Sequence, residues 1–450
     1  MQPKNAQNAQ NLEDHRAAGG SAASDGSANS ATTHAGMAAR MQHQILYGSQ
    51  VALGKRFNPF DAKLVDLGPG SEKLIFYYHQ GYSMNRMALD MADNCFGQAI
   101  SNTALLHAIL YMVGTDYDLR RQQADETALT LHHGGEAIRQ VNKTLSTGAF
   151  DDATVAAVAI IATRENLNGM FEAANTHMQG LRHLIAKRGG LQNIKGIHGR
   201  IVAWADFCAS SVQRSAPLLC KLEPAINASR RAIPRPSSAA TRDMLDPRDV
   251  FSLAEPAVSD AVYTLRYVSS LLSSKNDPQL DKKLISELVY DVEYCLGQFN
   301  TAAAPASLAA QPEMFPETLL HLSLQIYMYL VIRELPAASL LLGTLSDRLC
   351  AALKSHMPAA WTAYMSETAL HWYLWMLLLG HHTSSPGTCR QWFLQRLVAV
   401  CQKLQLTNAR AVQMCLFRVL WSEDPPCRNL VKGAWDAISA CHHLDVEEVA

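Results

Sequence analysis

The stretch 151–194, DDATVAAVAIIATRENLNGMFEAANTHMQGLRHLIAKRGGLQNI, carries the clearest helical pattern of the chain. Its second half spaces four apolar residues 4, 3 and 4 positions apart: Ala174, Met178, Leu181 and Ile185. This is one stripe of a 3.6-residue period, so the sequence predicts a helix over Phe171–Arg188. Gly189 and Gly190 favour a left-handed stop directly after that helix. Asp151 begins a shorter apolar helix that runs through Ala162.

Helical patterns separated by short breakers also fill the rest of the chain. Before and after the central stretch, helices are predicted over Ser71–Ala99, Ser101–Met112, Arg120–Leu145 and Gly199–Ser211. Further along, they are predicted over Ala257–Ser274, Asp281–Phe299, Glu317–Glu334, Leu340–Leu353, Ser366–Leu379, Arg390–Leu404, Asn408–Trp421 and Arg428–His442. No stretch alternates apolar and polar residues as a strand would. We therefore expect an all-α, multi-helix array, with the apolar helices Glu317–Glu334 and Ser366–Leu379 near its centre.

Composition divides the chain into two parts. Residues 1–44 contain no Ile, Val, Phe, Tyr or Trp. Such a segment cannot bury enough apolar surface to offset its ordering entropy, so we expect it to be disordered. Residues 45–445 are expected to form one helical domain. Pro, Ser and Arg residues near 217–249 predict a break between its two helical halves.

Charge and hydropathy exclude several classes of function. Hydrophobic residues make up 48% of the chain, charged residues 18%, and the net charge is −1. A protein that neutralises several phosphates normally has an excess of Lys and Arg, so we expect no direct DNA binding from this chain alone. The most apolar stretches, 319–332 and 368–380, are shorter than the roughly 18 residues that a membrane span needs. No apolar leader is present at the N-terminus, so we expect a soluble, intracellular protein.

No motif for catalysis, metal binding or cofactor binding is present. The ten cysteines lie at least 12 residues apart, which leaves no CxxC pair and favours free thiols inside helices. Histidines pair at 132–133, 381–382 and 442–443. Adjacent residues point about 100° apart on a helix and cannot share a zinc ion as HExxH does. The sequence therefore predicts no catalytic residue, no metal ligand and no cofactor.

Short motifs in and around the central stretch carry a family resemblance. They are Glu165, HMQGL at His177–Leu181, RGGL at Arg188–Leu191 and WAD at Trp204–Asp206. These motifs resemble the fungal-specific transcription factor domain, the regulatory domain of zinc-cluster transcription factors, over about Phe57–Cys441. The resemblance implies structural roles for the residues that match the family's motifs: Glu165, His177, Gly180, Leu181, Arg188, Gly189, Gly190, Trp204 and Asp206.

One feature departs from the family's pattern. A zinc-cluster module with six closely spaced cysteines usually precedes the regulatory domain and reads DNA, whereas residues 1–94 of this chain contain no cysteine. The resemblance therefore implies a regulatory domain without its own DNA-binding zinc cluster in this sequence: either the protein naturally lacks that module, or the sequence starts downstream of it. It would act through protein partners or as a homodimer, with a small effector as a further option, in the nucleus or the cytoplasm. A helical scaffold, or a biosynthetic enzyme with dispersed catalytic residues, stays open as the alternative.

The central motifs also predict a helical hairpin. Gly189 and Gly190 end the first helix and about ten residues return the chain, so Phe171–Arg188 and Gly199–Ser211 are expected to pack antiparallel. The stripe of Met178, Leu181 and Ile185 would then face that of Ile201, Trp204 and Cys208. Asp206 would need a cation, and Arg182 or Arg188 is the expected partner.

Overall fold

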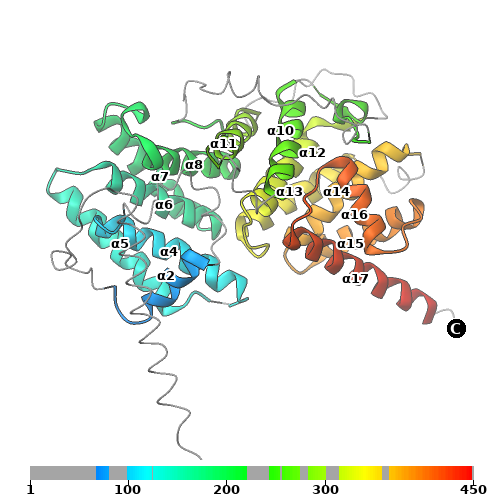
Figure 1. Cartoon of the computed structure of the whole chain (residues 1–450), viewed down its shortest axis with the longest axis horizontal. Helices are drawn as coiled ribbons and strands as arrows, with labels where there is room; N and C mark the ends of the chain where they lie inside the picture. The colour runs from blue at the N-terminus through cyan, green and yellow to red at the C-terminus, as the bar shows by residue number, and fades with distance from the viewer. Residues whose placement is uncertain are drawn as a thin grey trace, which may run out of the picture. The chain divides into compact units, whose positions relative to one another are not determined.

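The computed structural model describes residues 67–80, 99–123, 125–219, 243–253, 256–273, 282–299, 314–356 and 364–447. Within these ranges the chain is helical nearly throughout, as Figure 1 shows. Contacts group Phe60–Ala450 into one unit. The disorder predicted for residues 1–44 and most of the break predicted near 217–249 lie outside the described residues.

The predicted all-α fold is confirmed. The first half contains α2 (Ser71–Gln80), α4 (Thr103–Arg120), α5 (Ala128–Ser146), α6 (Asp152–Leu167), α7 (Phe171–Lys187) and α8 (Gly196–Gln213). The second half contains α10 (Pro256–Ser273), α11 (Lys282–Phe299), α12 (Glu317–Tyr327), α13 (Leu340–His356), α14 (Glu367–Thr383), α15 (Thr388–Lys403), α16 (Ala409–Val419) and α17 (Pro425–Glu447). Two short strands, β1 (Phe251–Ser252) and β2 (Phe315–Pro316), pair in parallel, with Phe251 opposite Phe315.

Helix α6 lies at the centre of the first half and packs against α4, α7 and α8. Every residue from Ala153 to Leu167 is buried, because apolar side chains cover all faces of this helix and other helices must surround it. Its start is fixed as the sequence predicts. The Asp151 carboxylate accepts the backbone N–H of Thr154 at 2.8 Å and so caps the helix.

Helix α7 confirms the stripe and the glycine stop. Its four predicted core residues are all buried: Ala174, Met178, Leu181 and Ile185. The helix ends at Lys187, and the next two glycines have positive φ, 81° at Gly189 and 109° at Gly190. A β-carbon at Gly189 would lie 2.7 Å from Nδ2 of Asn193. Both the backbone angle and the available space therefore favour glycine there.

Replacing Gly189 should destabilise the protein, whereas replacing Gly180 should not. We expect Gly189→Val to lower the free energy of unfolding by about 1–3 kcal/mol, because a β-branched residue resists positive φ. Gly180 lies in the interior of α7, where an added β-carbon meets nothing within 4 Å. Gly180→Ala should therefore stabilise the chain by about 0.5–1 kcal/mol. Urea unfolding of both variants measures this, and equal stability of the two would contradict it.

The helix predicted over Arg120–Leu145 is wrong at its start. Helix α4 continues to Arg120, and the chain then leaves the helical conformation, with φ of 55° at Gln122. Asp118 holds the turn: its Oδ2 accepts from the backbone N–H of Thr127 (3.0 Å) and from the hydroxyl of Thr130 (2.7 Å). Helix α5 therefore begins only at Ala128.

Two other predicted helices in the first half change their limits. The helix predicted over Ser101–Met112 begins at Thr103, because Asn102 caps it by accepting the Leu105 N–H at 3.0 Å, and it extends to Arg120. Of the helix predicted over Ser71–Ala99, the structure describes Ser71–Gln80 as α2, and residues 81–98 lie outside the described part.

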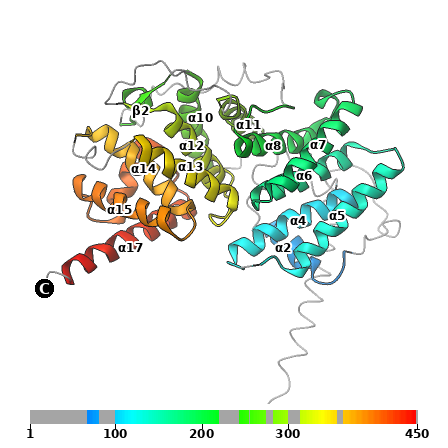
Figure 2. The same ribbon diagram turned by 180° about the vertical axis from the view of Figure 1, so that it is seen from behind.

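The two helices predicted near the centre of the array, Glu317–Glu334 and Ser366–Leu379, are buried among the helices of the second half. Helix α14 contacts α12, α13, α15, α16 and α17, and the labels of Figure 2 locate several of these elements around it. Trp372 and Trp375 of α14 are fully buried. The segment predicted as one helix over Glu317–Glu334 is α-helical only to Tyr327, and Met328–Ile332 then forms a π-helical turn.

Helix α13 closes the ends of two helices of the first half. Ser339, which directly precedes α13, donates its hydroxyl to the carbonyl of Leu167 at the end of α6 (2.7 Å). Arg348 donates to the carbonyls of Ser211 (2.8 Å) and Val212 (2.6 Å) at the end of α8. The last carbonyls of a helix have no partner within it, so these side chains satisfy oxygens that would otherwise need water.

A relay of hydrogen bonds fastens α2 to α4 and α5. Ser71 Oγ donates to the carbonyl of Leu67 (2.6 Å) and can therefore accept from Nε2 of His133 (3.1 Å). His133 Nδ1 is then an acceptor for Nδ1–H of His107 (2.9 Å). Burial is the main cause that lowers the pKa of His133 to about 4 and also lowers the pKa of His107, and the His132 imidazole adds to both shifts. Both rings are neutral in this relay.

The relay should make the protein less stable in mild acid. The pKa of His133 lies below that of an unfolded histidine, about 6.5, so the unfolded state binds more protons between pH 6.5 and 4. The stabilisation is complete above pH 6.5 and is lost as the pH falls toward 4. We expect about 1–2 kcal/mol less stability from His133 at pH 5 than at pH 7.

Urea unfolding at the two pH values measures this loss. His133→Gln keeps a side-chain donor but cannot titrate, so it should reduce the difference between pH 7 and pH 5. His183→Gln, at an exposed position of α7, is the matched control and should leave that difference unchanged. Equal pH dependence of the parent and His133→Gln would show that the relay does not titrate as described.

Candidate functional site

A buried charge network links α6 to its neighbours. Arg164 of α6 is 1% exposed. Its Nε donates to Oγ1 of Thr115 on α4 (2.9 Å), its Nη1 to Oε2 of Glu165 (3.1 Å), and its Nη2 contacts the carboxylate of Glu126. The guanidinium also lies 4.0 Å from the centre of the Tyr111 ring. This network joins α4, α6 and the segment that precedes α5.

Glu165, the first family-motif residue, is a member of this network. Its Oε1 accepts from the Tyr111 hydroxyl at 3.0 Å, while Oε2 accepts from Arg164. Burial, more than the neighbouring charges, raises the pKa of Tyr111 above its usual range. Since both oxygens of Glu165 are engaged and the phenol is protonated, this group holds helices together and offers no free base.

The HMQGL motif lies along α7. Leu181 is fully buried in the core, whereas Gly180 is exposed. His177 is half-buried, and burial lowers the pKa of its imidazole, against the opposing effect of the Glu165 charge. Within HMQGL, only Met178 and Leu181 are fully buried.

The RGGL motif joins the end of α7 to the start of α6. The guanidinium of Arg188 donates to the carboxylate of Asp152 in the first turn of α6. An acidic residue there also suits the positive end of the helix dipole. Gly189 and Gly190 turn the chain immediately afterwards, and Leu191 is buried. The glycines of RGGL thus end α7, and its arginine attaches the end of α7 to α6 through an ion pair.

Two residues of the predicted α8 stripe, Trp204 and Cys208, contact the second half. The guanidinium of Arg333 lies 5.0 Å from the centre of the half-buried Trp204 ring, and Arg333 also donates to Glu293 of α11 at 3.0 and 2.6 Å. Further along the stripe, Cys208 lies 3.7 Å from the hydroxyl of Tyr329 in the π-helical turn. Helices α7 and α8 contact each other and both pack against α6, while Trp204 and Cys208 of α8 reach residues of the second half.

The partner predicted for Asp206 is wrong. Asp206 is 2% exposed and accepts the backbone N–H groups of Leu218 (3.1 Å) and Leu219 (2.7 Å). Arg188 binds Asp152 instead. By accepting two backbone donors, the Asp206 carboxylate holds the chain after α8 in place. The sequence could not predict this role, because backbone N–H groups occur at almost every residue and leave no pattern in the side chains.

Asp206→Asn should therefore lower the free energy of unfolding by more than the loss of a solvent-exposed ion pair would. The amide has only one acceptor oxygen and no charge, so one backbone N–H loses its charged acceptor, at a cost of about 1–3 kcal/mol. Asp260→Asn, at an exposed position of α10, is the matched control and should change stability by less than about 0.5 kcal/mol. Urea unfolding at pH 7 compares them, and a neutral Asp206→Asn would contradict the double-acceptor role.

The Cys208 thiol and the Ser211 hydroxyl, two potential nucleophiles, are buried next to Tyr329. Burial raises the pKa of the Cys208 thiol to about 12, so it stays protonated at neutral pH. The hydroxyl of Ser211 lies 3.2 Å from that of Tyr329. In the described part of the chain, no group of three His, Cys, Asp or Glu side chains is placed to hold a metal ion. None of the described helices has both the length and the hydropathy of a membrane span.

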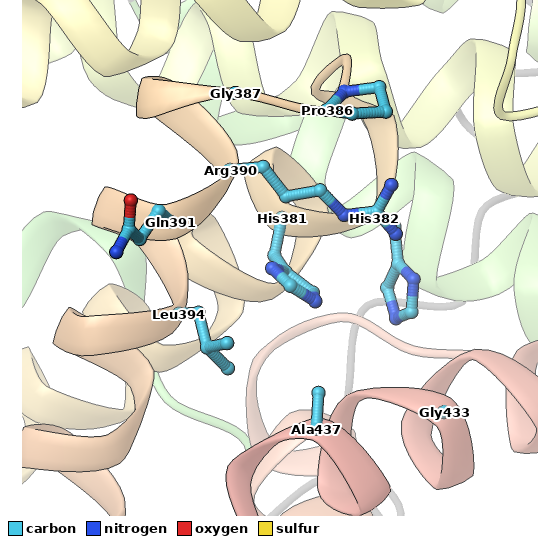
Figure 3. A pocket seen from close by; sticks show the side chains of 9 residues that line it. All are labelled: His381, His382, Pro386, Gly387, Arg390, Gln391, Leu394, Gly433 and Ala437. Atoms are coloured by element: carbon cyan, nitrogen blue, oxygen red, sulfur yellow. The ribbon is translucent and has the colours of Figure 1, made fainter. Parts of the chain in front are cut away.

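A pocket with a volume of about 520 Å³ opens between α14, α15 and α17 (Figure 3). His381 and His382 come from the end of α14, Gly387 from the connection to α15, and Arg390 from the first turn of α15. Ala437 of α17 forms the opposite wall. The sequence did not predict this pocket, although the adjacent His381 and His382 lie in its wall.

Both imidazoles of the pocket are neutral at physiological pH. Burial lowers the pKa of His382 to about 3, with smaller contributions in the same direction from His381 and Arg390. Burial also lowers the pKa of His381, assisted by the charge of Arg390. Arg390 thus supplies the only formal charge among the residues that line the pocket.

Comparison with known proteins gives the family. The family described as "fungal specific transcription factor domain" matches residues 89–442, which cover most of the chain and all of its central motifs. The chain belongs to this fungal-specific transcription factor domain family. No curated protein and no solved structure gives a significant match.

Proposed function

We propose that this chain is a transcription-regulatory domain that acts through contacts with other proteins. Membership of the family over residues 89–442 is the observation that carries the proposal. The nucleus is then its place of action. Protein partners or a second copy of the chain would link it to promoters, because the net charge of −1 provides no electrostatic basis for DNA binding by the chain alone.

The geometry of the motif residues supports a regulatory role over catalysis. Glu165 and Asp206 use their oxygens to hold helices and backbone, and Arg188 closes the end of α7. A catalytic group instead needs an exposed reactive atom within reach of a substrate. These motif residues therefore build a rigid helical frame, which suits a domain whose outer surface does the work.

A tethering experiment tests the proposal. The full 450-residue chain is fused to a heterologous DNA-binding domain that is inactive by itself, and transcription of a reporter carrying its binding sites is measured. We expect the fusion to change reporter transcription severalfold, in either direction. The same chain without the fused domain should leave the reporter unchanged, because it does not bind the promoter itself.

Arg164→Ala provides the control for folding. It leaves Glu126 and Glu165 without their buried cation, so it should unfold the frame and abolish the effect. A folded, nuclear fusion that leaves the reporter unchanged would refute the regulatory role. In that case a helical scaffold or an enzyme would be the better interpretation.

A further inference from the structure

The pocket between α14, α15 and α17 combines one cation with two buried imidazole nitrogens. Nδ1 of His381 and Nε2 of His382 are buried and make no hydrogen bond with the described residues, although the two rings lie close to the backbone of Arg390 and of Leu430, respectively. His381 is only 5% exposed. A buried polar atom without a partner costs free energy that a bound ligand can recover. In Figure 3 the side chain of His381 points toward α17, across the pocket.

Arg390 is the second element of the site. It forms no ion pair with any carboxylate of the described chain, and no acidic residue lines the pocket. In Figure 3 the Arg390 side chain extends toward His382, and its charge also contributes to the lowered pKa of both His381 and His382. Arginine binds carboxylates through two parallel hydrogen bonds, which makes it the natural anchor for such an anion.

The start of α15 adds backbone donors on the same side. Gly387 precedes the helix and offers no side chain to cap it, so no side-chain hydrogen bond closes the first turn. The first N–H groups of a helix carry partial positive charge and favour a negative ligand. A β-carbon at Gly387 would meet nothing within 4 Å, so the backbone is accessible there.

The other lining side chains are mainly apolar (Pro386, Leu394 and Ala437), with Gln391 as a further polar one. In Figure 3, Leu394 and Ala437 lie away from the Arg390 side chain. Its volume of about 520 Å³ lies within the range of pockets that hold small molecules. We propose that this pocket binds a small carboxylate with an apolar body, with the carboxylate on Arg390 and the start of α15 and the body against α17.

Binding of three molecules of equal size but different charge tests the site. Benzoate, benzyl alcohol and benzylamine are titrated into the full chain by calorimetry and ligand-observed NMR at millimolar concentrations. We expect benzoate to bind, and benzyl alcohol to bind at least about tenfold more weakly, since a charge-assisted hydrogen bond is lost. Equal binding of benzoate and benzylamine, or no binding of benzoate, would overturn the proposal.

Two substitutions place the binding in this pocket. Arg390→Gln should weaken benzoate binding by about tenfold or more. Arg396→Gln is the matched control on the same helix, because Arg396 lies against the ring of Trp392 and does not line the pocket. It should leave the affinity within about twofold. Equal losses in the two variants would show that benzoate follows net charge and not this site.

A third variant fills the pocket without altering charge. Gly433 lines the pocket from α17, and a β-carbon there would meet nothing within 4 Å. Gly433→Leu should therefore keep or slightly raise the melting temperature of the parent while abolishing benzoate binding. Unchanged binding would overturn the proposed location.

Binding of benzoate to the purified chain tests this pocket independently of the proposed function. If the purified chain binds benzoate but the folded, nuclear tethered fusion leaves the reporter unchanged, the regulatory role is refuted and the pocket is not.

Discussion

The buried guanidinium of Arg164 is the constraint on which the first half depends. A cation inside a protein costs several kcal/mol unless partners surround it, and here those partners come from different elements. Thr115 belongs to α4, Glu126 precedes α5, and Glu165 belongs to α6. The apolar surface of α6 attracts other helices from all sides without favouring one register. The guanidinium favours one register, because Thr115 of α4 and Glu126 before α5 must both reach it, whereas Glu165 is its neighbour on α6.

The second half is joined to this frame by a local irregularity. The π-helical turn after α12 ends in a hydrogen bond from the backbone N–H of Arg333 to the carbonyl of Met328 (2.8 Å). The extra residue in that turn helps to set the direction in which Arg333 leaves the backbone, toward Glu293 and the Trp204 ring. Trp204 of the WAD motif is thus covered by Arg333, a residue more than a hundred positions later in the chain.

Local signals were sufficient where the decisive partners are near in sequence. The cap at Asp151, the stripe of α7 and the stop at Gly189 could all be predicted, because each depends on residues within one or two helical turns. The turn after Arg120 could not, since it depends on Asp118 binding residues nine and twelve positions later. For the site, Glu165 was identified as a structural residue, but its partners and the pocket beside Arg390 require the folded arrangement.

The closure of α6 and α8 by Ser339 and Arg348 bears on how the polypeptide can be divided. The connection between α8 and α10 looks like a domain linker in composition, but the helix ends on one side of it are completed by side chains from the other. A fragment that stops after α8 would expose carbonyl oxygens that α13 normally covers, and it would be a poor autonomous folding unit. Conversely, two fragments produced by a cut between residues 219 and 243 would still be joined by the hydrogen bonds of Ser339 and Arg348, so we expect them to remain associated. For truncation and for gene fusion, the two halves should therefore be handled as a single cooperative body.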